Sequence, residues 1–163
     1  TETGRLTPEY MMKCLMLRSR DNARTPVQWN AQENAGFTAG TPWLKVNDNY
    51  KEINMADQDQ DPDSILNYYR RLIALRKSPT YKEVFTYGKF IPAYQDTEDV
   101  MAYYRKDEHT RILVAANFGK ESVELPLDYP VKQVLLSNQH KQHNYNTESH
   151  LSLESCEVIV FEL

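Results

Sequence analysis

The stretch DPDSILNYYRRLIALRKSP, residues 61–79, separates two parts of the sequence that differ in character. Asp61 is typical of a helix N-cap and Pro62 of a first helical position, while the closing serine–proline pair is typical of a helix end. Apolar residues recur between them at helical spacing: Ile65, Leu66, Tyr69, Leu72, Ile73 and Leu75. We therefore predict an amphipathic helix over residues 64–77, with its basic end at the C-terminus, where the helix dipole favours cations.

Downstream of this helix, short apolar runs alternate with turns rich in Gly, Asp, Asn and Pro. This pattern is typical of strands in an antiparallel sandwich. We expect strands at residues 84–87, 89–94, 100–105, 111–116, 122–125, 132–137, 151–153 and 157–161. The continuously apolar run at 112–116 predicts the central strand, and the last run should hold the end of the chain in the sheet. The expected fold is mainly β, with an antiparallel Greek-key β-sandwich over residues 81–163.

Upstream, residues 1–80 read as a helix, a long loop and a second helix. Thr7 and Pro8 predict a helix start, and the helix over residues 8–18 is apolar around most of its circumference, so it needs neighbours on several sides. Residues 19–59 show no sustained periodicity. A loop of this length is usually functional or has been removed from its setting. The segment should therefore depend on structure that these residues do not encode.

Composition narrows the partners. The chain has 163 residues, a formal net charge of −4 and a pI near 5.6, which gives no basic footprint for nucleic acid. Its apolar runs are too short to cross a membrane. We expect a soluble protein with neither a nucleic-acid nor a membrane partner. The two cysteines, Cys14 and Cys156, should be reduced, buried packing residues.

Two clusters could suggest a metal, and neither fits one. The alternating aspartates Asp57, Asp59, Asp61 and Asp63 resemble the start of a calcium loop, but the positions that need Gly and Glu are Pro62 and Tyr68. They read better as an acidic linker and helix cap. The histidines 140, 143 and 150 lack ligands at matching offsets and read as a solvated turn. No metal and no cofactor is expected.

The loop segment SRDNARTPVQW, residues 19–29, carries the most chemistry. Arg20 and Arg24 offer planar guanidinium groups whose forked donors suit vicinal hydroxyls or carboxylates. The structural alternative is a loop in which Asp21 pairs with an arginine. Trp29 and Trp43 leave a similar choice, because each could be a platform for a sugar ring or an anchor for the loop.

Residues 19–29 closely resemble the RDNARTPMQW signature of the oligo-1,6-glucosidase group within glycoside hydrolase family 13. The resemblance continues through NAGFTAGTPWLKVNDNYKEIN, residues 34–54, and through the helix at 61–77. It covers the β-rich tail only by pattern, and it departs at Val27, where the group usually has Met. The resemblance implies that residues 1–80 are the C-terminal segment of a catalytic (β/α)8 barrel. Residues 81–163 would be a sandwich that braces the barrel by packing on the helix at 64–77.

The resemblance also implies a mechanism. The group hydrolyses α-glucosidic bonds with retention, using an aspartate nucleophile and a glutamate acid/base about 5 Å apart. The group places these carboxylates on barrel strands that precede Thr1, so no residue here is expected to be catalytic. Arg24 is expected to bind hydroxyls of the innermost glucose, with Arg20 as second choice. An arginine cannot be the acid or base, because it stays protonated.

The expected function is thus the C-terminal fragment of a cytoplasmic α-glucosidase acting on α-1,6 and α-1,4 bonds of short oligosaccharides. Its partners would be the substrate and the missing barrel, and alone it should be inactive. With helix 8–18 uncovered, we expect dimerisation, segment swapping or disorder in residues 1–60. A trehalose-6-phosphate hydrolase and a sucrose isomerase are alternatives. Two non-enzymatic alternatives are a carbohydrate-binding β-sandwich module and the heavy subunits of amino-acid transporters, which share the family fold.

Overall fold

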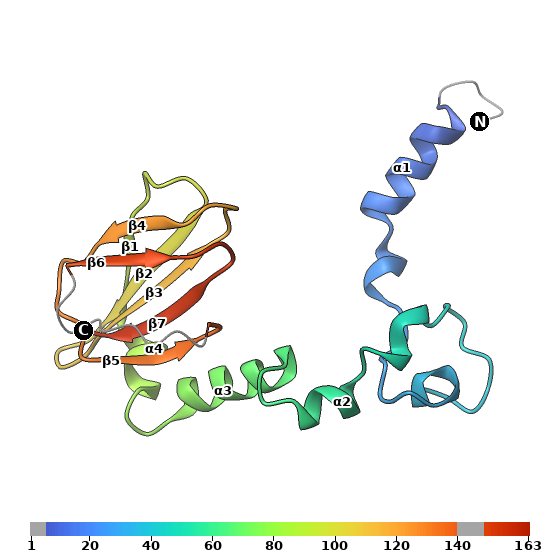
Figure 1. Ribbon diagram of the computed structural model, residues 1–163, viewed down its shortest axis with the longest axis horizontal. Coiled ribbons are helices and arrows are strands. Elements are labelled where there is room, and N and C mark those ends of the chain that lie inside the picture. The colour runs from blue at the N-terminus through green and yellow to red at the C-terminus, as the bar shows by residue number, and fades with distance from the viewer. Residues whose placement is uncertain (1–5, 140–148) are drawn as a thin grey trace. The chain divides into compact units, whose positions relative to one another are not determined.

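The computed structural model describes residues 6–139 and 149–163, which divide into two units, Thr1–Asn67 and Tyr68–Leu163 (Figure 1). The described residues of the first unit form two α-helices, joined by irregular chain with three single-turn 3-10 helices. These elements are α1 (Pro8–Arg18), η1 (Arg20–Ala23), η2 (Glu33–Gly36), η3 (Asp48–Lys51) and α2 (Met55–Gln60). The described residues of the second unit form most of α3 (Ile65–Lys77), then α4 (Lys82–Tyr87) and seven strands. No helix in the described residues is long and apolar enough to span a bilayer.

Helix α1 has the predicted bounds, and Thr7 is its N-cap as expected. The Thr7 hydroxyl accepts a hydrogen bond from the Tyr10 backbone N–H at 3.2 Å, and Pro8 occupies the first turn, where its missing N–H costs nothing. No residue of α1 is buried. The helix leaves these large apolar side chains exposed: Tyr10, Met11, Met12, Leu15, Met16 and Leu17. Cys14 is half-buried and Cys156 exposed, so the expected burial of both cysteines is wrong, although neither forms a disulfide.

Helix α2 was not predicted, because the sequence analysis assigned its acidic residues to a linker. The buried side chain of Asn54 starts it: Oδ1 accepts from the Asp57 backbone N–H at 3.1 Å, and Nδ2 donates to the Tyr50 carbonyl at 3.0 Å. An N-cap of this kind satisfies an otherwise unpaired donor of the first turn. Six residues are too few to show a helical period, so only the cap residue could have indicated the helix.

Helix α3 begins at Ile65, later than its predicted cap implied. Asp61 is not the cap; its Oδ1 accepts from the Asp63 backbone N–H at 2.9 Å within a turn. The hydroxyl of Ser64 takes that role, accepting from the Asn67 backbone N–H at 3.2 Å and donating to the Gln58 carbonyl at 2.6 Å. The turn at 61–64 thus joins α2 to α3. Helix α3 starts where the buried Ser64 hydroxyl hydrogen-bonds both to α2 and to its own first turn.

The expected strand at 84–87 is wrong, since these residues form the last turn of α4. A short apolar run does not by itself separate strand from helix. Here the turn after α3 decides the outcome, because the backbone N–H groups of Tyr81 and Lys82 donate to the Ser78 carbonyl. The side chain of Arg105 then donates to the carbonyls of Phe85 and Thr86 at 3.0 and 3.2 Å, satisfying acceptors that end the helix.

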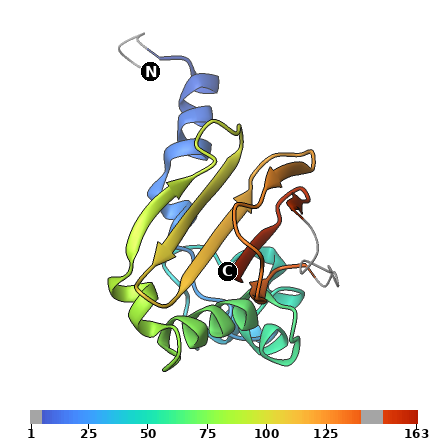
Figure 2. The ribbon, with the colours of Figure 1, turned by 90° about the vertical axis from the view of Figure 1, so that its left-hand side faces the viewer.

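The strands form an antiparallel sheet of five and a second sheet of two (Figure 2). The larger sheet has the order β1-β2-β3-β7-β5, and the smaller pairs β4 with β6. Their bounds are β1 (Lys89–Ala93), β2 (Val100–Lys106), β3 (Arg111–Asn117), β4 (Val123–Pro126), β5 (Gln133–Ser137), β6 (His150–Leu153) and β7 (Val158–Glu162). The predicted central position of 112–116 is confirmed, and so is the insertion of the last strand into the sheet.

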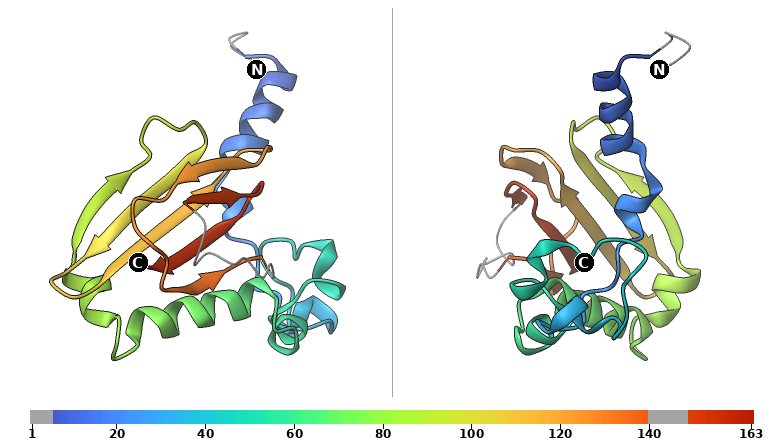
Figure 3. Two further views of the ribbon diagram at one scale, coloured as in Figure 1. Left: turned by 60° about the vertical axis from the view of Figure 1, so that its left-hand side comes forward. Right: turned by 90° about the vertical axis from the view of Figure 1, so that its right-hand side faces the viewer.

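The five-stranded sheet is apolar on both faces. On one face Leu113 and Phe161 belong to a core that includes Leu125, Leu151 and Leu153 of the small sheet, which makes the sandwich (Figure 3). On the other face a second core is centred on Val84, Ile112, Leu136 and Val160. Tyr68 and Leu75 of α3 pack against this second core, which confirms that the sandwich packs on this helix. The alternation along β3 explains how one strand serves both cores.

A polar cluster ties the start of α4 to the last strand. The Tyr81 hydroxyl donates to Glu162 Oε2 at 2.7 Å, and Gln133 Nε2 donates to the same oxygen at 2.8 Å. These hydrogen bonds from Gln133 and Tyr81, with the nearby charge of Lys132, hold the pKa of Glu162 below its usual value. Burial and the Glu162 carboxylate raise the pKa of Tyr81 to about 12.

The lowered pKa of Glu162 predicts an acid-sensitive sandwich. Because the folded state favours the ionised carboxylate, its stabilisation is present above the ordinary glutamate pKa near 4.5 and is lost as the pH falls through the lower folded value. The variant Glu162→Gln should lose stability at pH 7 and show a smaller further loss at pH 3.5 than the parent. Urea unfolding followed by circular dichroism measures this. Glu124→Gln, an exposed position on β4, is the control; equal pH dependence in the Glu162→Gln variant and the parent would contradict the assignment.

Candidate functional site

The two arginines of the SRDNARTPVQW segment lie on and just after η1. The Ser19 hydroxyl accepts from the Asp21 backbone N–H at 3.3 Å, and the Arg24 N–H donates to the Asp21 carbonyl at 3.0 Å. The local turn is therefore built by backbone groups and a serine. Both arginine side chains are exposed. Among the described side chains neither guanidinium pairs with a carboxylate, so the Asp21 pair expected of a purely structural loop does not form.

The other end of the segment is fixed to the start of α2. The backbone N–H groups of Met55 and Ala56 donate to the carbonyls of Gln28 and Trp29 at 2.8 and 3.0 Å. The side-chain amide of Gln28 also donates to the Ile53 carbonyl. These contacts join residues about 25 positions apart in sequence. They also use N–H groups of the first turn of α2, which have no partner within the helix.

A left-handed turn at residues 34–36 also holds the end of the segment at Trp29. Asn34, Ala35 and Gly36 all have positive φ values, of 51°, 57° and 66°. The Ala35 carbonyl accepts from the N–H groups of Trp29 and Asn30 at 2.9 and 3.2 Å. A Cβ at Gly36 would lie 2.6 Å from Asn30 Nδ2, so a side chain there meets both strain and a clash. The turn explains why glycine stands at this position.

The tryptophans of the loop are accessible. Trp29 is 50% exposed and Trp43 is 83% exposed. An exposed ring face can pack on the C–H face of a pyranose, and it can equally pack on protein. The sequence analysis missed Asn54 and Gln28, the two side chains that anchor the loop. Asparagine is a common N-cap residue, so Asn54 could have been identified as the start of a helix. No sequence pattern indicated the role of Gln28.

The acidic run does not gather as a metal site. Asp57 Oδ2 accepts from Asn54 Nδ2 at 2.7 Å, and Asp61 is used in its turn. Across residues 6–139 and 149–163 no group of three or more metal-binding side chains comes together. His140 and His143 lie outside the described residues, and the ring of His150 contacts the Ser149 hydroxyl at 2.9 Å. The SRDNARTPVQW segment thus presents permanently charged arginines and an exposed aromatic ring, and an arginine does not transfer protons.

Two family models match this chain. The family model described as "Alpha amylase, catalytic domain" matches residues 2–88, and that of the "Alpha-amylase SusG C-terminal domain" matches residues 100–160. The chain is 40% identical to an oligo-1,6-glucosidase of Bacillus cereus over 161 residues, 95% of this chain and 28% of the relative. It spans less than a third of the length of that relative.

Solved structures give the same result. An isomaltulose synthase of Erwinia rhapontici NX5 superposes with a TM-score of 0.88 and 41% identity, covering 100% of this chain and 29% of that one. A trehalose-6-phosphate hydrolase of Bacillus licheniformis superposes with a TM-score of 0.85 and 38% identity, covering 99% and 29%. Because the catalytic-domain model covers more than half of the residues and includes the arginine loop, the chain belongs to the alpha-amylase family, glycoside hydrolase family 13.

Proposed function

We propose that this chain is the C-terminal part of a cytoplasmic, retaining α-glucosidase that hydrolyses α-1,6 and α-1,4 bonds in short oligosaccharides. The observation that carries the proposal is the SRDNARTPVQW segment, folded as an anchored loop with two unpaired, exposed arginines. The named relatives support the substrate class, since the relative in Bacillus cereus is an oligo-1,6-glucosidase. We place the boundary between barrel segment and sandwich at residues 80 and 81.

In this proposal Arg24 holds the substrate and does not react with it. A guanidinium donates up to five hydrogen bonds in one plane, which suits neighbouring sugar hydroxyls. The aspartate and glutamate that break the bond would be supplied by barrel strands outside these residues. In this proposal the chain positions the substrate, and the barrel strands carry out proton transfer and covalent chemistry.

A trehalose-6-phosphate hydrolase is the second candidate. It is favoured by the match to the Bacillus licheniformis structure and by a Bacillus subtilis relative of the same name, 37% identical over 155 residues. The two candidates share the arginine loop and differ in whether the substrate carries a phosphate. Comparing isomaltose with trehalose 6-phosphate as substrates of the complete enzyme decides between them.

Replacement of Arg24 tests the positioning role. In the complete enzyme Arg24→Ala should lower kcat/KM for isomaltose about tenfold or more, because a charge-assisted hydrogen bond to a buried hydroxyl is worth about 1.5–3 kcal/mol. Arg20→Ala, a matched change in the same loop, should have a smaller effect. Steady-state kinetics on both variants give the comparison. A larger loss for Arg20→Ala would exchange the two roles, and no loss in either would remove the loop from the binding site.

The chain alone should lack both activity and affinity for neutral sugars. Without the aspartate and glutamate it should release no product from 4-nitrophenyl α-glucoside above the buffer rate. Titrating isomaltose and maltose by calorimetry should give no binding at millimolar concentrations. Measurable binding without turnover would instead favour the carbohydrate-binding β-sandwich module, and turnover would show that the catalytic groups are in this chain.

The exposed apolar surface of α1 predicts self-association of the isolated chain. Met12 and Leu15 are 59% and 54% exposed, and burying them against a second copy would remove apolar area from water. Sedimentation velocity should show a dimer that the double change Met12→Lys, Leu15→Lys shifts toward monomer. Lys13→Gln on the same helix should leave the dimer intact. A concentration-independent monomer with ordered residues 6–60 would refute the expectation.

A further inference from the structure

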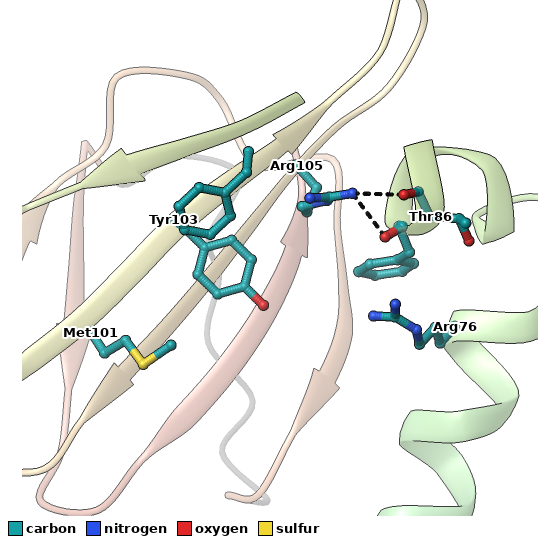
Figure 4. Close-up of a pocket in the computed structure, with 7 residues that line it drawn as sticks. Arg76, Thr86, Met101, Tyr103 and Arg105 are labelled. Atoms are coloured by element: carbon teal, nitrogen blue, oxygen red, sulfur yellow. Dashed lines mark hydrogen bonds between the residues drawn. The ribbon is translucent and has the colours of Figure 1, made fainter. Parts of the chain in front are cut away.

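A pocket on the second unit lies outside the arginine loop and has no role in the proposed hydrolysis. Its volume is about 390 Å³, at the lower end of the range for small-molecule sites. It opens beside β1 and β2, next to the C-terminal ends of α3 and α4 (Figure 4). The lining side chains are Arg76, Phe85, Thr86, Phe90, Met101, Tyr103 and Arg105.

The pocket walls are rich in donors and poor in acceptors. Arg76 and Arg105 bring two positive charges, and no aspartate or glutamate lines the pocket. Arg105 is held in place because its Nε and Nη2 atoms donate to carbonyls of α4, whereas Arg76 has no polar partner among the described residues. Figure 4 shows the Arg76 guanidinium and the Tyr103 hydroxyl pointing toward the same space. A ligand group that only accepts hydrogen bonds and carries negative charge therefore fits this end.

The opposite wall is aromatic. The rings of Phe90 and Tyr103 lie 4.9 Å apart between centroids and are inclined by 32°, so they stack on each other and leave only the outer face of the pair open. Phe90 and Met101 are 52% and 55% exposed, which leaves this face accessible. The strands fix it, since β1 and β2 pair in register from Lys89 with Lys106 to Ala93 with Ala102. A ring with an apolar C–H face can pack on such a surface.

We propose that this pocket binds a phosphorylated monosaccharide. The sugar ring packs against the outer face of the stacked Phe90–Tyr103 pair, and the phosphate oxygens accept hydrogen bonds from Arg76, with Arg105 adding positive charge behind them. The two arginines and the absence of a carboxylate among the described lining residues separate this ligand from a neutral sugar, because only the phosphate gains charge-assisted hydrogen bonds. The site is independent of the glucosidase proposal, because it uses no residue of residues 1–67.

The test uses the full 163-residue chain in phosphate-free buffer. Amide chemical shifts of the ¹⁵N-labelled chain are followed while glucose 6-phosphate, glucose and inorganic phosphate are added in separate titrations. Glucose 6-phosphate should shift pocket residues, with a Kd at least about tenfold below that of either part alone. Absence of saturable shifts overturns the proposal. Equal affinity for inorganic phosphate overturns the ring contact, and equal affinity for glucose overturns the phosphate contact.

Two pairs of variants separate the pocket from general effects of charge or hydrophobicity. Arg76→Gln should weaken binding about tenfold, while Lys77→Gln, the next residue on α3, removes the same charge outside the pocket and should change it little. Phe90→Ala should weaken binding about threefold, whereas Phe118→Ala, another exposed phenylalanine, should not. Arg76 and Phe90 are exposed, so folding should survive both changes, and the dispersion of the amide spectrum verifies this. Equal effects within either pair would refute the site.

Discussion

Two backbone hydrogen bonds, from Met55 and Ala56 to the carbonyls of Gln28 and Trp29, are the constraint on which the arginine loop depends. They close a segment of irregular chain onto the first turn of a helix, where N–H groups need partners from outside the helix. Asn54 makes this possible, because its buried side chain starts α2 at that point. The left-handed turn at 34–36 adds a carbonyl on the other side of Trp29. The largely irregular loop is thus held by hydrogen bonds to the first turn of α2 and to the turn at 34–36.

The second unit shows a different use of the same chemistry. Arg105 lies on β2 and donates to carbonyls at the end of α4, so a strand side chain fixes the end of a helix. This contact keeps its guanidinium beside the aromatic rings of Phe90 and Tyr103 in the pocket. The arginines thus differ in their partners. The Arg105 guanidinium is occupied by backbone carbonyls, whereas those of Arg24 and Arg76 have no polar partner among the described residues and can bind a ligand in the two proposals.

Sequence reasoning succeeded where a long apolar pattern or a strong cap was present. The start of α1 followed from Thr7 and Pro8, and the central strand followed from the apolar run at 112–116. It failed where a tertiary contact decided the outcome. Residues 84–87 are helical because the turn at Ser78 and the side chain of Arg105 complete a helix that the apolar pattern alone did not reveal. The arginines of the site were identified from a motif, whereas the pairing of Gln28 with residues 53–56 spans too much sequence to be read locally.

The position of β7 between β3 and β5 has a consequence for synthesis of the protein. It is the last of the described strands to be synthesised, yet it pairs on both sides and supplies Phe161 to the interior core. Before it arrives, β3 and β5 present open edges, and unpaired edges recruit other chains. A product of premature termination would keep those edges open and offer them to proteases and chaperones. The sheet therefore closes only after β7 has been synthesised, so a folded sandwich requires translation at least through Glu162.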